Sequence, residues 1–290
     1  MGKTILITGA TSGIGRDAAL YLHQKGHRVI ATGRNERALA ELAEAGLVAL
    51  PLDVTDAGSI GELKRSVDEL TGGEGIDALV NNAGYGLVGP LEILSERDVR
   101  AQFETNVFGL LNMTRAFVPQ MRDKGAGRVV NISSVGGRMT FPLGGAYHAT
   151  KYAVEAMSDA LRMELRQFGI EVVVIEPGYI DTGFTSTTLG LLDRYKDVGG
   201  PYAQSLALAD QADESKLARF AVKPRVISKA IERAIVARRP RARIVAPWIN
   251  SFGPWFRELL PTRLVDWVLR KVAGLVPKSA STEPRALPST

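Results

Sequence analysis

The sequence predicts an α/β protein whose parallel β-sheet is covered by helices on both faces. Short apolar, β-branched runs recur along the chain, and segments of helix length separate most of them. These runs are continuously apolar, which is typical of strands buried on both faces. With 290 residues, 45% of them hydrophobic, the chain is long enough to bury such a core.

About seven strands are expected from this pattern, at residues 4–9, 28–33, 47–54, 77–84, 128–134, 171–177 and 242–247. Helical patterns lie between them, for example at residues 16–26 and 96–121. The alternation predicts a single doubly wound Rossmann-type domain over residues 1–276. Within it, we expect residues 183–225 to form a substrate lid and residues 240–276 a C-terminal extension, and residues 277–290 to be a disordered tail.

Composition excludes several classes of site. The chain has no cysteine, which excludes disulfides and thiolate metal sites, and its three histidines lack the spacing of metal ligands, so no metal is expected. Residues 238–271 contain eight basic and two acidic residues, which accounts for the net charge of +5. The rest of the chain is therefore not basic, and no nucleic-acid partner is expected. Without a signal-peptide pattern or a long apolar run, we expect a cytoplasmic location.

The first chemical motif, "TGATSGIG", covers residues 8–15 at the end of the first strand. Gly9 permits a tight turn, and Gly13 and Gly15 let the backbone approach a pyrophosphate at the start of the first helix. The spacing is G-x-x-x-G-x-G, and an ordinary glycine-rich turn is the alternative. Its position between the first strand and the first helix favours dinucleotide binding.

The end of the second strand bears on the choice of dinucleotide. Sites for NAD usually place a carboxylate here, on the ribose 2′-hydroxyl. This chain has Gly33 followed by Arg34, and an arginine can bind a 2′-phosphate with two hydrogen bonds. Arg34 could instead be a solvated loop residue, but the sequence favours NADP(H).

Two segments have a tyrosine four residues before a lysine. "YHATK" contains Tyr147 and Lys151, and "YLHQK" contains Tyr21 and Lys25, so the spacing alone has little specificity. The strand before "YHATK" ends at Ser134, on the edge of the sheet where ligands bind in α/β proteins. Tyr21 and Lys25 fall near the far end of the first helix, so we expect them to serve packing and surface roles.

In order and spacing, residues 3–185 resemble the short-chain dehydrogenase/reductase family, through "TGATSGIG", "LDV", "NNAG", "TNVFG", "NISSVGG", "YHATK" and "PGYIDT". The resemblance implies a catalytic set of Asn106, Ser134, Tyr147 and Lys151. It also implies a cofactor-binding set, formed by Gly9, Thr11, Ser12, Gly13, Ile14, Gly15, Arg34, Asp53, Val54, Asn82, Ala83, Gly84, Tyr147, Lys151, Pro177, Gly178, Ile180 and Thr182. A homodimer or homotetramer is implied as well.

These residue types suit carbonyl chemistry. An isolated tyrosine titrates near pH ~10, and we expect the ammonium of Lys151 to lower the pKa of Tyr147 toward neutrality. Ser134 would hydrogen-bond the substrate oxygen. By resemblance, Lys151 also holds the nicotinamide ribose, and Asn106 anchors a water that passes protons from Lys151 to solvent. His148 is expected to point away from the catalytic face and receives no role.

Met139, Phe141 and Leu143, just before the catalytic tyrosine, predict an apolar pocket. They could equally pack under the lid, whose apolar residues include Phe184 and Leu189. We expect an NADP(H)-dependent oxidoreductase of lipophilic ketones, aldehydes or alcohols, of steroid, retinoid or fatty-chain type. The alternatives are a non-catalytic NADP(H)-binding regulatory protein, which the intact Asn–Ser–Tyr–Lys set opposes, and a peripheral membrane or scaffold protein acting through its C-terminus.

The C-terminal region contains all three tryptophans, at positions 248, 255 and 267. Apolar residues from Leu264 to Leu275 recur at helical spacing beside basic residues, a pattern that suits a membrane surface. Covering the sheet edge or a partner subunit is the alternative, and we favour it. More loosely, this region resembles the C-terminal extension of the 17β-hydroxysteroid dehydrogenase-like and retinol dehydrogenase-like branch.

Overall fold

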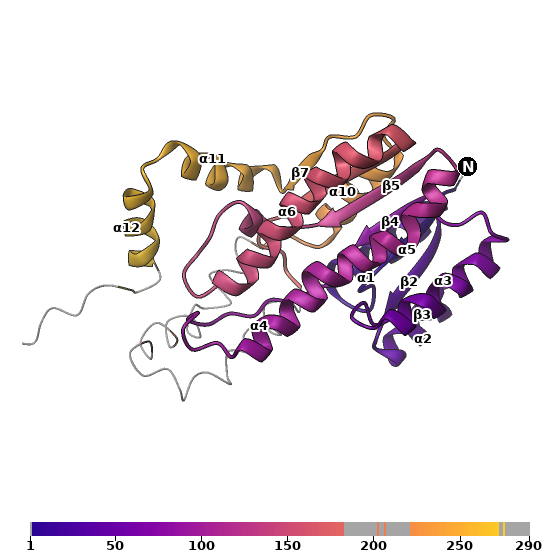
Figure 1. Ribbon diagram of the computed structural model, residues 1–290, viewed down its shortest axis with the longest axis horizontal. Helices are drawn as coiled ribbons and strands as arrows, with labels where there is room; N and C mark the ends of the chain where they lie inside the picture. Colours follow the sequence, from indigo (N-terminus) through magenta and orange to yellow (C-terminus); the bar gives the residue numbers. More distant parts are fainter. Residues whose placement is uncertain (1, 183–201, 203–205, 207–220, 273–274, 276–290) are drawn as a thin grey trace, which may run out of the picture.

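The computed structural model describes residues 2–182, 202, 206, 221–272 and 275. Its centre is a seven-stranded parallel sheet in the order β3-β2-β1-β4-β5-β6-β7 (Figure 1). The strands are β1 (Thr4–Ile7), β2 (Arg28–Gly33), β3 (Val48–Pro51), β4 (Ala78–Asn81), β5 (Gly127–Ile132), β6 (Ile170–Pro177) and β7 (Arg243–Ala246). The expected seven-stranded parallel sheet is confirmed.

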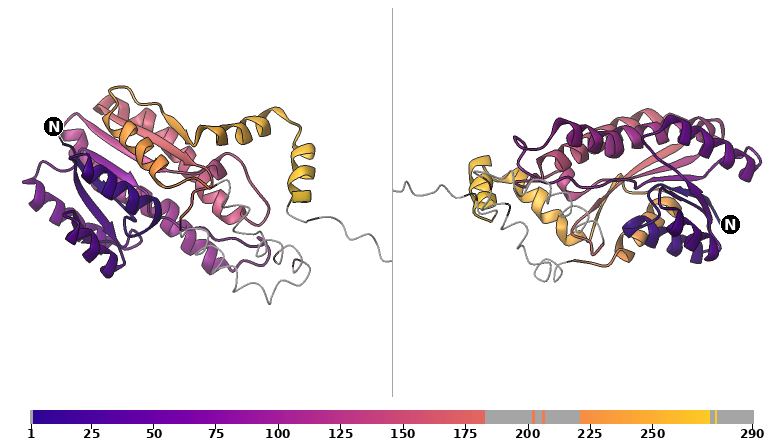
Figure 2. Two further views of the ribbon diagram at one scale, coloured as in Figure 1. Left: turned by 180° about the vertical axis from the view of Figure 1, so that it is seen from behind. Right: turned by 90° about the horizontal axis from the view of Figure 1, so that it is seen from below.

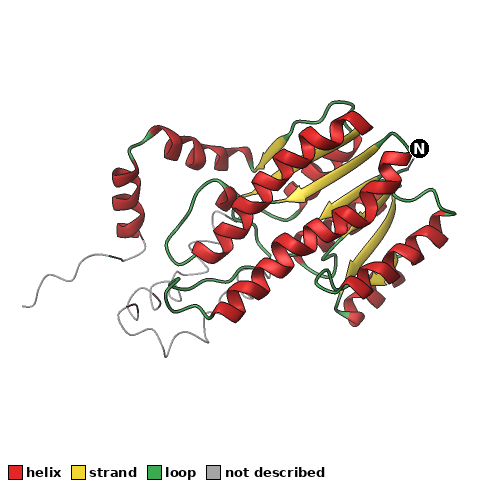
Figure 3. Ribbon diagram, viewed as in Figure 1, coloured by secondary structure: helices red, strands yellow, loops and turns green. Residues whose placement is uncertain are grey.

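Helices cover both faces of this sheet (Figure 2, right; Figure 3). One face packs against α1 (Gly13–Gln24), α2 (Glu36–Glu44) and α10 (Arg225–Val236). The other packs against α3 (Ala57–Thr71), α5 (Leu110–Asp123) and α6 (Gly145–Leu165). Alternation along β1 shows the two layers directly, because Ile5 and Ile7 lie in the first core and Leu6 in the second. The doubly wound fold is therefore confirmed.

The strand order reverses between β1 and β4, which are neighbours in the sheet although β2 and β3 separate them in sequence. In open α/β sheets, ligands bind beyond the carboxyl ends of the strands at such a reversal. The glycine-rich turn after β1 and the segment after β4 both lie at this position.

The helix expected at residues 96–121 has an interruption. It consists of α4 (Glu96–Phe103), a π-helical segment η1 (Glu104–Gly109) and α5. Such π-helical turns occur mostly as short insertions in α-helices, frequently at functional sites. Asn106 lies in this segment and is buried.

The chain continues after β7 into a short turn η5 (Trp248–Ser251) and two helices, α11 (Phe252–Leu259) and α12 (Thr262–Val272). Both helices extend away from the sheet instead of lying along its edge (Figures 1 and 2). The expectation that this region covers the sheet edge is therefore wrong, and the expectation that it covers a partner subunit stays a prediction. Within the described ranges, no helix is long and apolar enough to cross a membrane.

Two other expectations fall mainly outside the described residues. These are the tail at 277–290 and most of the lid at 183–225, including Phe184 and Leu189. At the described end of the lid, Val222 forms a parallel bridge with Ile180, just before α10 begins.

Candidate active site

The predicted site residues come together along the carboxyl ends of the strands. The glycine turn follows β1, Arg34 follows β2, and Asp53 and Val54 follow β3. Asn82–Gly84 follow β4, Ser134 follows β5, and Gly178 follows β6. Sequence positions spread over nearly 180 residues thus share one edge of the sheet.

Backbone geometry explains the glycines of the first turn. Gly9 has a φ of +65°, in the left-handed region that favours glycine. A Cβ on Gly15 would lie 2.3 Å from the carbonyl oxygen of Gly9, so only glycine fits there. Asn82 Nδ2 donates to the carbonyl oxygens of Thr8 and Gly9, at 2.9 and 3.1 Å, and fixes the turn.

Thr8 supports this turn, although the sequence reading gave it no role. Its hydroxyl oxygen accepts hydrogen bonds from the backbone N–H groups of Asn82 and Ala83, at 2.9 and 3.0 Å, and its side chain is buried. These bonds join the segment after β4 to the end of β1. The only sign of this role in the sequence was a threonine at the end of a buried strand, and that feature is too common to identify a functional residue.

The first turn of α1 is suited to an anion. Helices α2, α3 and α4 are capped by the side chains of Asn35, Asp56 and Ser95. Ser12, at the same position of α1, makes no such bond, and the first turn of α1 contains no acidic residue. The backbone N–H groups that a cap would satisfy are therefore available to a phosphate, and the residues present fit a dinucleotide.

Arg34 lies at the open end of this edge. Its side chain is 73% exposed, and Nη1 is 3.7 Å from Asp53 Oδ2, a loose contact. Asp53 Oδ1 accepts from the backbone N–H and the hydroxyl of Thr55. Burial acts to raise the pKa of Asp53, but these hydrogen bonds and the charge of Arg34 outweigh it and lower that pKa. Arg34 is thus placed to turn toward a ligand at low cost.

The "PGYIDT" segment lies opposite the glycine turn. A Cβ on Gly13 would lie 3.4 Å from Thr182 Cβ, so the two segments are in close contact. Three predicted cofactor residues have side chains in the core instead: Val54 and Ile180 are buried, and Ile14 packs against the first core. These three residues could therefore contact a cofactor only through backbone atoms.

Asn106 links three segments of the catalytic edge. Its Nδ2 donates to the carbonyl oxygen of Tyr85 at 2.9 Å and to Thr150 Oγ1 at 3.1 Å. Its Oδ1 accepts from the backbone N–H of Tyr85 at 3.0 Å. A Cβ on Gly84 would lie 3.0 Å from Asn106 Oδ1 and 3.8 Å from Lys151 Nζ. The π-helical turn therefore places this amide beside the lysine.

Ser134, Tyr147 and Lys151 form the centre of the site. Lys151 Nζ lies 5.7 Å from the centroid of the Tyr147 ring and donates to the carbonyl oxygen of Ile132 at 2.9 Å. Ser134 Oγ accepts from the backbone N–H of Gly136 at 3.0 Å and shares a hydrogen bond with Tyr147. One helical turn of α6 and the end of β5 are enough to assemble the three groups.

Burial controls the acidity of this pair. It raises the pKa of Tyr147 to about 12, against the opposing effect of the hydrogen bond with Ser134. It lowers the pKa of Lys151 to about 8, although the charge of Glu155 acts in the other direction. The net shift for Tyr147 is thus opposite to the one expected from the neighbouring Lys151, because desolvation of the phenolate dominates.

His148 is buried and holds the loop that follows Ser134. Its Nδ1 lies 3.0 Å from the carbonyl oxygen of Gly136, and a Cβ on Gly136 or Gly144 would meet its ring at 2.3 or 2.4 Å. Burial lowers the pKa of His148, so the ring is neutral at physiological pH. It is therefore a positioning residue, and the small residues flanking it were the signal in the sequence.

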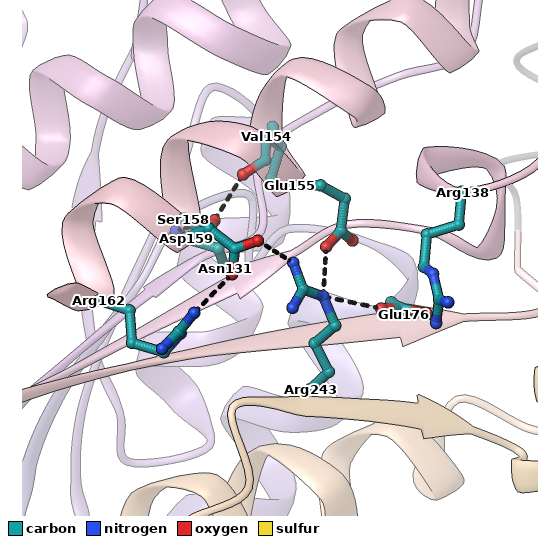
Figure 4. Close-up of polar contacts among 9 residues, drawn as sticks. All are labelled: Asn131, Arg138, Val154, Glu155, Ser158, Asp159, Arg162, Glu176 and Arg243. Atoms are coloured by element: carbon teal, nitrogen blue, oxygen red, sulfur yellow. Dashed lines mark hydrogen bonds and ion pairs between the residues drawn. The ribbon is translucent and has the colours of Figure 1, made fainter.

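A partly buried ion cluster fixes α6 against the neighbouring strands (Figure 4). Arg243, from β7, contacts Glu155 Oε2 at 3.0 Å and Asp159 Oδ2 at 2.6 Å on α6. Its Nε also lies 3.5 Å from Glu176 Oε1 on β6. Because Glu155 is one turn beyond Lys151, the cluster holds the catalytic part of α6 in register with the sheet.

Residues 3–189 match the family model described as short chain dehydrogenase. The chain belongs to this family. It is 34% identical to a 3-ketodihydrosphingosine reductase from Bacteroides thetaiotaomicron, over 92% of this chain and 97% of that protein. It is 34% identical to human 17-beta-hydroxysteroid dehydrogenase type 6 over 93% and 88% of the two chains, and 33% identical to human retinol dehydrogenase 16 over 92% and 87%.

Solved structures of this short-chain dehydrogenase family agree with the fold. A serine dehydrogenase complexed with NADP+ matches at a TM-score of 0.72, with 32% identity over 83% of this chain and 93% of that one. A short-chain dehydrogenase/reductase from Burkholderia phymatum in complex with NAD matches at 0.74, with 26% identity over 93% and 95%. The protein is therefore an oxidoreductase of carbonyl or hydroxyl groups in the retinol and hydroxysteroid dehydrogenase-like branch.

Proposed function

We propose that the protein is an NADP(H)-dependent reductase of lipophilic ketones and aldehydes, with Tyr147 as the general acid. Arg34 is the observation that carries the choice of cofactor. It occupies the end of β2, where a carboxylate would select NAD, and its exposed guanidinium is only loosely held by Asp53. A 2′-phosphate offers it two charge-assisted hydrogen bonds.

Tyr147 can supply the proton that reduction of a carbonyl group requires. With a pKa raised to about 12, the phenol keeps its proton at neutral pH and can donate it to an oxygen on which negative charge develops. When bound, the nicotinamide supplies the hydride.

Three other residues would assist the reduction. Ser134 lies beside Tyr147 and can hydrogen-bond the same substrate oxygen, which polarises the carbonyl group. Lys151, with a pKa of about 8, can exchange a proton near neutral pH. Asn106 orders the backbone of Tyr85 and the hydroxyl of Thr150 next to that ammonium.

A lipophilic substrate is supported by the loop between Ser134 and Tyr147. This loop carries Met139, Phe141 and Leu143, and the Phe141 side chain is exposed beside the catalytic helix. Three relatives are named for a ketodihydrosphingosine, retinol and a hydroxysteroid, all of which are largely apolar.

Titration with NADPH and NADH, with turnover of a panel of bulky ketones, tests the proposal. Arg34→Asp should weaken NADPH binding by ~10- to 100-fold and leave NADH binding nearly unchanged, because only the 2′-phosphate contact is lost. Arg37→Asp, on an exposed arginine of α2, is the matched control for charge reversal. Equal losses for the two nucleotides would refute the cofactor assignment, and turnover confined to small polar substrates would refute the substrate class.

A further inference from the structure

The C-terminal arm, residues 248–272, carries two rows of exposed apolar side chains. The side chains in these rows are far more exposed than core residues, although each of them is large and hydrophobic. They are Trp248, Ile249, Phe252, Phe256, Leu259, Leu260, Leu264, Trp267 and Val268. Among described residues this is the densest group of exposed large hydrophobic side chains, and such groups usually mark an interaction surface.

Helical geometry arranges these side chains. Phe252, Phe256 and Leu259 recur at spacings of four and three residues on α11, and the Trp248 ring extends that row by contacting Phe252 at 5.8 Å between centroids. On α12, Leu264, Trp267 and Val268 follow the same spacing. Each helix therefore presents an apolar face outward.

The inner side of the arm lines a cavity. A cavity of about 400 Å³ lies between the arm and the loop before Tyr147, and its lining includes Met139, Val265 and Leu269, together with the exposed Leu260 at its margin. On α12, Val265 and Leu269 are one helical turn apart and lie beside the exposed row. The other residues of the two rows stay exposed, on an arm that projects from the sheet (Figures 1 and 2).

The charge of the C-terminal arm indicates which kind of partner its exposed apolar face would bind. The arm contains Arg257, Arg263, Arg270 and Lys271 against two acidic residues, a net of +2. Lys271 Nζ lies 4.2 Å from the centroid of the Trp267 ring, so a basic group and an interfacial aromatic group share one position. A second copy would bring the same positive charge against this face, whereas an anionic lipid surface complements it.

We propose that the C-terminal arm docks the protein on an anionic phospholipid surface. The outer rows of α11 and α12 lie among the lipid headgroups and upper acyl chains, and the basic residues contact the phosphates. The cavity behind α12 then lies close to the membrane, on the side of the catalytic loop. This docking does not depend on the identity of the cofactor or of the substrate.

Tryptophan fluorescence provides a specific test, because all three tryptophans of the chain lie in the arm. Vesicles of phosphatidylcholine with phosphatidylglycerol should shift the emission of the full-length protein to the blue and carry the protein down in co-sedimentation. The binding should weaken as salt is added. No binding and no shift with these vesicles would overturn the proposal, and equal binding to pure phosphatidylcholine would overturn its electrostatic part.

Two double variants locate the surface. Phe256→Ser with Trp267→Ser should weaken vesicle binding by ~10-fold or more, because two half-exposed aromatic groups no longer enter the interface. Met163→Ser with Val236→Ser removes hydrophobic groups of similar exposure outside the arm and should leave binding unchanged. Thermal unfolding of both variants checks that they fold.

Arg263→Gln with Arg270→Gln tests the charged residues separately. This variant keeps the apolar rows, and its vesicle binding should fall several-fold and lose most of its salt dependence. Equal binding by the Phe256/Trp267 variant and the Met163/Val236 control would overturn the proposal. So would a dimer that the Phe256/Trp267 variant alone abolishes while vesicles are not bound, since the arm would then join two copies of the chain.

Discussion

Two tyrosine–lysine pairs of this protein share their spacing and nearly their geometry. Lys25 Nζ lies 5.6 Å from the Tyr21 ring centroid, and Lys151 Nζ lies 5.7 Å from that of Tyr147. Their surroundings differ. Lys25 is exposed, and the Tyr21 hydroxyl donates to Glu232 Oε2 at 2.5 Å, far from the catalytic edge. Lys151 is only 6% exposed, and Tyr147 meets Ser134.

From this contrast we expect the environment of each pair, rather than its spacing, to decide whether it is catalytic. The hydrogen bond to the Glu232 carboxylate raises the pKa of Tyr21, so the hydroxyl proton stays in that bond. Burial raises the pKa of Tyr147 too, but its hydroxyl lies at the edge where a substrate oxygen can take the proton. Removing the same atoms from each pair should therefore have very different effects.

The largest difference is expected for turnover of the lysine variants. Lys151→Met should lower kcat/KM for ketone reduction by ~10³-fold or more, because it removes both the proton donor beside Tyr147 and the contact expected for the nucleotide. Lys25→Met should change it by no more than about twofold. Steady-state kinetics with NADPH measure both, and comparable losses would mean that the two pairs are not functionally distinct.

The same two variants should also differ in stability. Here we expect Lys151→Met, which loses turnover, to be the more stable variant. The folded-state pKa of Lys151, about 8, lies below its ordinary 10.5, so between these values the unfolded chain binds more protons and the free energy of unfolding rises with pH. Below pH 8 the buried charge costs about 3 kcal/mol, and loss of the hydrogen bond to Ile132 offsets about 1. Lys151→Met should thus be about 2 kcal/mol more stable than wild type near neutrality.

Urea unfolding of the nucleotide-free protein checks this prediction at several pH values. The advantage of Lys151→Met should disappear as the pH rises from 8 to 10.5, because the unfolded wild-type chain then loses the Lys151 proton as well. Lys25→Met should follow wild type throughout. An advantage that does not change with pH would show that packing, and not the buried charge, is responsible.

The smallest effect concerns the partner of Tyr21. Glu232→Gln keeps the shape of the side chain but removes the charged acceptor, and we expect a loss of about 1 kcal/mol in the free energy of unfolding. Turnover should be unchanged, since α10 lies on the face of the sheet opposite α6. A large fall in kcat would contradict the separation of the two regions.

The sequence predicted the sheet well because its strands are continuous β-branched runs buried on both faces. It also placed the candidate catalytic residues on one edge, since a parallel sheet brings all carboxyl strand ends together. The π-helical turn at Glu104–Gly109 was not predictable, because helical periodicity continues through it and tertiary bonds of Asn106 define it.

Environment was harder to read than position. The pKa of Tyr147 was expected to fall because a lysine follows it by one turn, whereas burial of the phenol raises it. The path of the C-terminal arm was also missed, since an amphipathic pattern shows that a helix has an apolar face but not what covers it.

Turnover of Tyr147→Phe and Tyr21→Phe, measured side by side with NADPH and a lipophilic ketone, tests the central claim most directly. The account predicts a loss of ~10²- to 10⁴-fold for Tyr147→Phe with nucleotide affinity nearly intact, and wild-type turnover for Tyr21→Phe. Robust reduction by Tyr147→Phe would contradict it.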